Sequence, residues 1–200
     1  MTLARSGDDR GSTIPLYIWL VGVLLFVAFL FFVLAKGAVA RNGAQSAADA
    51  AALAAAQDVR DELTDGFLDD LESGNWEEWL DGNGFLGDGH DAAVDLAAAN
   101  DASLTGLATG EVDGKPSFEA RVETNYAVGE SLVPGTENTR AKAQATAVIE
   151  PRCNVEVDID PAKDVKFTCE GSGSWEIDPK DPGDVDLPKA KDLFAVHLAD

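Results

Sequence analysis

The sequence predicts an α+β protein built on one long N-terminal helix, followed by a small domain with short helices and an antiparallel sheet. Three observations support this fold class. An uncharged apolar run covers residues 14–35, an alanine-rich tract occupies residues 36–73, and apolar and polar residues begin to alternate at residue 111. The run is typical of a transmembrane helix, the tract of a helix in water, and the alternation of half-buried strands. We therefore expect a single-pass membrane protein with one modest domain.

The apolar run, IPLYIWLVGVLLFVAFLFFVLA, has the length of a membrane-spanning helix. Its twenty-two residues form about 33 Å of helix, against about 30 Å for the hydrocarbon core of a bilayer. Proline is absent between Leu16 and Pro116, so no residue forces a break where the helix leaves the membrane. We expect one rod from Ile14 to Glu72, half in lipid and half in water, preceded by a polar cytoplasmic tail at residues 1–13.

The charges that flank the span leave its orientation undecided. Arg5 and Arg10 precede it, and Lys36 and Arg41 follow it, so the positive-inside rule gives a tie. The two cysteines, which we expect to form a disulfide, break the tie, because disulfides belong in oxidising compartments. The N-terminus is then expected in the cytoplasm and the domain outside it.

A cleaved signal peptide is the competing interpretation of the same segment. Ala38-Val39-Ala40 resembles a small-residue cleavage site. However, the apolar run is much longer than the roughly 7–15 residues of a signal peptide, and Asp8 and Asp9 stand where positive charge is usual. We expect the segment to be retained, and the mass of the mature protein distinguishes the two possibilities.

The alanine tract places small side chains along one face of the predicted helix. Residues at steps of three or four share a face, and this stripe consists of Ala40, Ala44, Ala47, Ala51 and Ala55. A smooth face lets another backbone approach closely, so we expect it to pack beside neighbouring proteins. The alternative is that the alanines merely stabilise the helix.

Beyond the alanines the same helix becomes bulkier on one face. Val59, Leu63, Phe67 and Leu71 follow one another at steps of four. This spacing is typical of a helix that packs on the core of its own domain. Gly74 is a suitable residue to end the helix.

Residues 74–110 are expected to hold short helices and a glycine-rich loop. One helix carries Trp76 and Trp79, the loop DGNGFLGDGHD fills residues 81–91, and a further helix covers residues 91–99. The two tryptophans either stack on a sugar ligand or pack in the core, and core packing is the commoner role.

The antiparallel β region is expected at residues 111–170. Apolar and charged residues alternate over residues 118–126, and small and polar residues alternate over 141–149. The last segment, residues 171–200, is rich in Asp, Pro and Lys, and we expect an irregular acidic tail from which Phe194 packs back on the domain.

A hairpin centred on Pro161 is the most specific structural prediction. One register places Cys153 opposite Cys169 and Val155 opposite Phe167. The other pairs in this register are Val157 with Val165, Asn154 with Thr168, and Glu156 with Lys166. Directly opposed cysteines can form a disulfide, which would stabilise the domain by about 3 kcal/mol. Two free buried thiols are the alternative.

The sequence offers no motif for catalysis. Its two histidines have no partner at metal-ligand spacing, and neither a nucleophile elbow nor a nucleotide-binding glycine motif occurs. The loop after Asp81 fails the EF-hand pattern, because Phe85 and Leu86 stand where an oxygen ligand and a glycine are required. Looser calcium sites remain open at two places, near Asp88 and Asp91 and among Asp178, Asp181, Asp184 and Asp186. We expect no enzymatic activity, no cofactor and no resident metal.

The net charge of −21 excludes one class of partner. The four charges before the span cancel and the span has none, so the whole excess follows Ala35. A domain this acidic is repelled by nucleic acid and by anionic headgroups. We expect no nucleic-acid partner.

The residues around the span share a pattern with a known family: Arg10-Gly11-Ser12 before it, then Arg41, Gln45 and the string AADAAALAAA at residues 47–56. Over about residues 10–60 this pattern resembles the N-terminal region of TadE/TadG-like Flp (tight adherence) pilus-assembly proteins. The resemblance implies a pilin-like layout anchored in a bacterial cell membrane. It also implies the lipid bilayer and other pilus-assembly or pilin subunits as partners, the latter through the helix.

Two properties of such pilus proteins are not implied. A prepilin-peptidase substrate carries Glu at the fifth position after the cleaved glycine, whereas Leu16 holds that position after Gly11. The D-x-S-x-S metal motif of larger TadG-like proteins is also missing, so metal-dependent adhesion does not follow.

Three hypotheses about function remain. The first is a non-enzymatic, membrane-anchored component of a Flp/Tad-type pilus, either a minor pilin-like subunit or an assembly factor. The alternative is a single-pass envelope protein unrelated to pili, whose acidic domain binds a ligand through Trp76, Trp79 or its loops. A subunit that stabilises a membrane enzyme is a third possibility.

Overall fold

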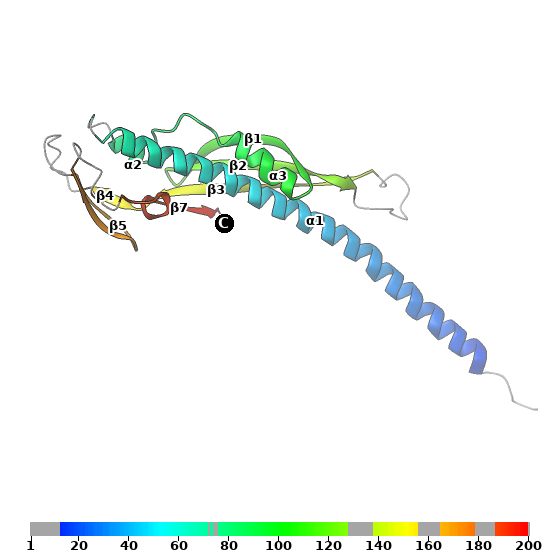
Figure 1. Cartoon of the computed structure of the whole chain (residues 1–200). Coiled ribbons are helices and arrows are strands. Elements are labelled where there is room, and N and C mark those ends of the chain that lie inside the picture. The colour runs from blue at the N-terminus through cyan, green and yellow to red at the C-terminus, as the bar shows by residue number, and fades with distance from the viewer. Residues whose placement is uncertain are drawn as a thin grey trace, which may run out of the picture.

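One helix organises the computed structural model of the chain (Figure 1). α1, Thr13–Asp69, has 57 residues and is about 86 Å long. It passes Lys36 and Gly43 without a break and ends slightly before Glu72, so the predicted continuous rod is confirmed. The structure describes residues 13–71, 73, 76–127, 138–155, 165–178 and 187–199. Residues 1–12 of the cytoplasmic tail expected at 1–13, and Gly74, lie outside these ranges.

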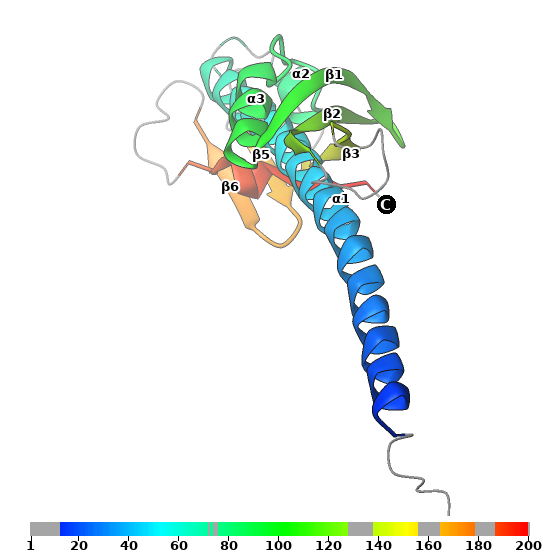
Figure 2. The same cartoon turned by 90° about the vertical axis from the view of Figure 1, so that its right-hand side faces the viewer.

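The main sheet has four strands in the order β1-β2-β3-β7, each antiparallel to its neighbours. They are β1 (Ala102–Val112), β2 (Lys115–Ala127), β3 (Arg140–Pro151) and β7 (Phe194–Leu198). The C-terminal half of α1 lies along this sheet against β2 and β3. α3 (His90–Ala99) lies beside α1 and against β1 (Figure 2). The predicted α+β class, with a long helix and antiparallel sheet, is confirmed.

A second sheet packs near the C-terminal end of α1. Its antiparallel strands are, in order, β4 (Cys153–Val155), β5 (Val165–Cys169) and β6 (Gly173–Ile177). Two single-turn helices complete the domain, α2 (Glu77–Leu80) and α4 (Ala190–Leu193). The ring of Phe67 meets Phe167 and Trp76 edge to face, with centroids 5.6 and 6.2 Å apart. The small sheet and α2 therefore share one core with α1.

Alternation in the strands decides which side chains face α1. Phe118, Ala120 and Val122 of β2 are buried, as are Ala147 and Ile149 of β3, and all five belong to the core that includes α1. The residues between them on β2 carry charges that remain accessible to water. Both strands lie where the alternation predicted them and extend beyond the predicted ranges.

Two expectations about element boundaries are wrong. The β region begins at Ala102 rather than at residue 111, because β1 pairs with β2 along its length despite Gly106 and Gly110, which interrupt its pattern. The segment 171–200 is not simply irregular: β6 and α4 form there, and β7 joins the main sheet beside β3. Phe194, at the start of β7, is 1% exposed, so it packs back as expected.

Candidate functional site

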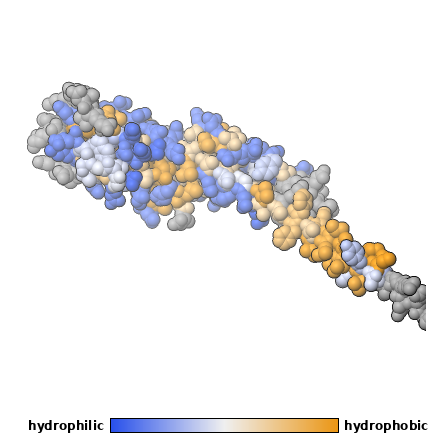
Figure 3. All heavy atoms as spheres, turned by 60° about the horizontal axis from the view of Figure 1, so that its bottom comes forward, coloured by the Kyte–Doolittle hydropathy of each residue, from blue (hydrophilic) through white to orange (hydrophobic). Residues whose placement is uncertain are grey.

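The N-terminal half of α1 projects from the domain, and no other described element covers it. Leu16 is 70% exposed and Phe31 is 74% exposed. None of the most apolar stretch of the helix is buried inside the molecule. On the face shown in Figure 3, the surface of the rod is mostly hydrophobic, whereas the visible surface of the domain is more hydrophilic. Within the described residues, α1 is the one helix long and apolar enough to cross a membrane.

The alanine stripe lies on the other half of α1 and is covered by the protein's own sheet. Ala40 is 3% exposed, and Ala44, Ala47, Ala51 and Ala55 are fully buried. The first two pack with Ala141 of β3, and the others belong to the main core. The expectation that this face packs beside neighbouring proteins is therefore wrong, because the stripe serves contacts within the chain.

Small residues on both surfaces let the helix and the domain approach closely. At Gly43 an added Cβ atom would collide with the hydroxyl of Tyr126, at the end of β2. At Gly89, which has a positive φ of 67°, it would collide with the backbone of Ala55. These contacts begin about 12 Å beyond Ala35, counted along the helix. The domain is therefore packed closely against α1 a short distance beyond the end of the apolar run.

The glycine-rich loop is held by a carboxylate of α1. Glu62 accepts hydrogen bonds from the backbone N–H groups of Leu86, at 2.9 Å, and Gly87, at 3.1 Å. Asp88 accepts one from the N–H of His90 at 3.0 Å, at the start of α3. In the part of the chain that the structure describes, no three His, Cys, Asp or Glu side chains converge. In the second candidate calcium site expected from the sequence, Asp181, Asp184 and Asp186 lie outside the described residues.

The two tryptophans of the glycine-rich region pack in the core. Trp76 is 3% exposed and meets Phe67 edge to face. Trp79 is partly buried, and its Nε1–H donates to Asp70 Oδ2 at 2.7 Å. Gly66 of α1 leaves room for its ring, since a Cβ there would collide with it. Trp76 is therefore covered within the core, and the indole N–H of Trp79 is bonded within the chain.

The disulfide forms between the residues that the hairpin register placed opposite each other. Cys153 and Cys169 are bonded and paired, Asn154 faces Thr168, and Val155 faces Phe167. The pairs expected at Glu156 and Val157, and the turn at Pro161, lie outside the described residues. On its other side, β5 pairs with β6, where Lys166 forms an ion pair with Glu176 at 2.7 Å.

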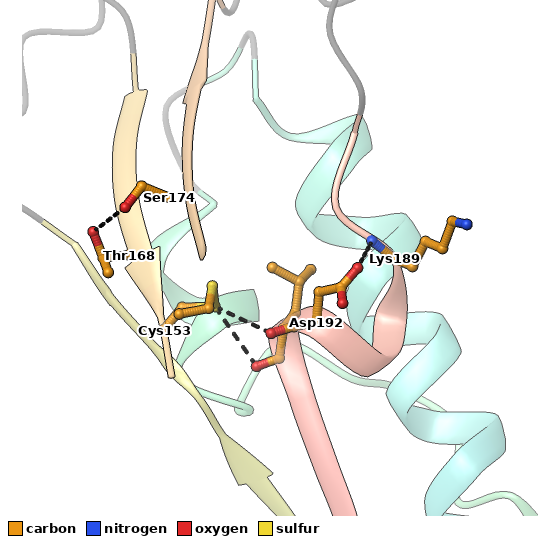
Figure 4. Close-up of a disulfide and its surroundings, with 7 residues drawn as sticks. Cys153, Thr168, Ser174, Lys189 and Asp192 are labelled. Carbon is orange, nitrogen blue, oxygen red and sulfur yellow. Dashed lines mark hydrogen bonds between the residues drawn. A yellow bond between two sulfur atoms is a disulfide. The ribbon is translucent and has the colours of Figure 1, made fainter. Parts of the chain in front are cut away.

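The disulfide also contacts the C-terminal part of the chain (Figure 4). The Sγ atom of Cys153 lies 3.9 Å from the carbonyl oxygen of Asp192 and 3.8 Å from that of Leu193. Because a bonded sulfur has no proton to donate, these are van der Waals contacts. The N–H of Arg152 donates to the Leu193 carbonyl at 2.9 Å. The bridge therefore stands where β4, β5 and the start of β7 meet.

Together these features fit a single-pass membrane protein whose anchor and domain core are parts of the same helix. Residues 11–58 match the family model of TadE/G-like Flp pilus-assembly proteins. The matched segment lies almost entirely within α1, from the start of the apolar run to just past the string AADAAALAAA. This confirms the resemblance stated from the sequence. No curated protein and no solved structure matches the chain.

Proposed function

We propose that this chain is a non-enzymatic component of a bacterial Flp/Tad-type pilus, either a minor pilin-like subunit or an assembly factor. The observation that carries the proposal is the coincidence of the matched residues 11–58 with an unbroken helix that has an exposed apolar half. In this role the helix holds the protein in the cell membrane and supports the domain outside it.

The orientation of the proposed anchor rests on the disulfide. A bridge between Cys153 and Cys169 persists in an oxidising compartment and is rare in the cytoplasm. We therefore infer that the acidic domain lies on the extracytoplasmic side and that the N-terminus is cytoplasmic. The domain is held rigidly relative to the anchor, since it packs on α1 from Ala40 onward. No loop separates this part of α1 from the apolar half.

Helix contacts with other pilus subunits are proposed for the exposed segment of α1 rather than for the alanine stripe. Residues from Ile14 to Val39 are largely exposed where their side chains are described, whereas the stripe is fully used within the chain. In lipid such contacts depend on close packing and not on the hydrophobic effect. The alternative of a ligand-binding envelope protein loses its main support, because Trp76 and Trp79 pack in the core.

Gene deletion tests the proposal. Loss of the gene should abolish or shorten surface filaments in electron micrographs, and the wild-type gene should restore them. A variant with Leu24 and Leu25 replaced by arginine should fail to restore them, because each arginine in mid-span costs about 2.5–3.5 kcal/mol on insertion. Normal filaments in the deletion strain would contradict the proposal.

A further inference from the structure

Charged side chains of opposite sign flank the two edge strands of the main sheet. At one edge, β1 and its flanking turns, residues 101–114, have three acidic side chains and no basic one: Asp101, Glu111 and Asp113. The other edge strand, β7, has no Asp, Glu, Lys or Arg, but the described segment just before it has two exposed lysines, Lys189 and Lys191. Asp192 is the one acidic residue in the described segment 187–199. The C-terminal end of β1 and the segment before β7 are thus complementary in charge, although the chain as a whole is strongly acidic.

Both edges also offer backbone groups for pairing. Among the described residues, β1 pairs with β2 alone and β7 with β3 alone. Edge strands are usually protected by lysine, proline or covering loops. β1 contains neither lysine nor proline, and it is uncharged from Ala102 to Gly110, in a chain of which 26% is charged. Its bulge between Leu104 and Gly106 is the one irregularity.

The directions of the edge strands decide how a second copy can dock. Since each strand is antiparallel to the next in the order β1-β2-β3-β7, β1 and β7 run in opposite directions. A second copy whose helix points the same way therefore presents its β1 antiparallel to β7 of the first. A parallel pairing of two β1 strands gives the slightly less stable kind of ladder. An antiparallel two-fold pairing of β1 with β1 would invert one copy, because the strands run roughly along α1 (Figure 1). Two anchors in one membrane forbid that arrangement.

We propose that β1 of one copy pairs with β7 of the next, so that the main sheet continues from subunit to subunit along the membrane surface. The contact is heterologous and open-ended, which favours rows over closed dimers. With four strands per copy at about 4.8 Å each, neighbouring helices would stand about 19 Å apart and would not touch. The inference rests on the proposed membrane anchor, which fixes all copies in one orientation.

The contact is short, so confinement to the membrane is part of the proposal. β7 has five residues, which limits the ladder it can form. Anchoring raises the effective concentration of the two edges and fixes their relative direction. Pairing is therefore expected in membranes and is best measured there with the full chain.

Cysteine crosslinking in membranes tests the pairing. Both native cysteines are in the disulfide, so introduced thiols are the free ones. Thr109→Cys marks the exposed edge of β1 and His197→Cys marks β7. With a short bifunctional maleimide, the double variant should give a ladder of dimers, trimers and larger species. Each single variant should stay monomeric, because a heterologous contact never brings two identical positions together.

Controls separate edge pairing from chance collision. A variant with Gln57→Cys alone, exposed on α1, should give no crosslinked dimer, since neighbouring helices stand too far apart. Adding Glu111→Lys to the double variant should reduce the ladder about two- to fivefold, whereas Asp58→Lys, with the same change in net charge, should leave it unchanged.

Three outcomes overturn the proposal: dimers from Thr109→Cys or His197→Cys alone, a crosslinked fraction in the double variant no larger than that of Gln57→Cys, or equal effects of the two lysine substitutions. If deletion of the gene still removes filaments, these outcomes refute edge pairing alone. The proposed pilus role would then stand.

Discussion

Replacing Phe67 by alanine should destabilise the domain strongly, because this ring joins α1 to the small sheet and to α2. Phe67 is fully buried, and its ring meets those of Phe167 and Trp76 at 5.6 and 6.2 Å. Loss of a buried phenylalanine with both ring contacts costs about 3–5 kcal/mol. For a domain of this size, 1 kcal/mol shifts the unfolding midpoint by about 2–4 °C, so we expect a drop of roughly 6–20 °C.

The assay is thermal unfolding of the full chain in detergent, followed by far-UV circular dichroism. Phe31→Ala is the matched control, since it removes the same ring from the same helix at a position 74% exposed in the apolar half. This control should leave the midpoint of the domain unchanged. Equal midpoints for the two variants would refute the reasoning, because α1 would then not form the core of the domain.

Three further predictions follow from named contacts. Cys169→Ser should lower the free energy of unfolding by about 3 kcal/mol, and a reducing agent should destabilise the wild type equally. Ala51→Leu should cost about 1–3 kcal/mol by overpacking in denaturant titrations, whereas Ala38→Leu, at an exposed position, should cost nothing measurable. The hydrogen bond from Lys115 lowers the pKa of the Glu150 carboxyl below its ordinary 4.5. Because the pKa of Glu150 is lower in the folded state than in the unfolded state, the pair with Lys115 stabilises the fold above about pH 4.5. This contribution, about a few tenths of a kcal/mol, is lost on acidification. The Glu150→Gln variant should not show this loss.

The sequence was most informative where a physical constraint acts along a single element. Length and composition identified α1, since a bilayer requires about twenty apolar residues and nothing interrupts the helix before Asp69. The hairpin register could be predicted because the cysteines and the apolar residues agree on one alignment. The burial of Leu63 and Phe67 followed from their helical spacing in the same way.

Tertiary contacts decided what the sequence left open. The alanine stripe was assigned to neighbouring proteins, yet it packs on the chain's own sheet, because small residues permit close approach without specifying the partner. β7 was missed although Phe194, Val196 and Leu198 alternate, since five residues amid Asp, Pro and Lys are a weak signal. Its partner β3 stands more than forty residues earlier in the chain, so only the folded sheet reveals the pair.

The central claim is that one unbroken helix crosses the bilayer and then forms the core of the domain. Spin labels at Leu24 and Gln57, both exposed and thirty-three residues apart on α1, test this by a distance measurement in lipid vesicles. A continuous helix predicts one narrow distance distribution centred at about 50 Å. A broad distribution, or one centred well below that distance, would mean a joint between the span and the domain and would contradict the claim.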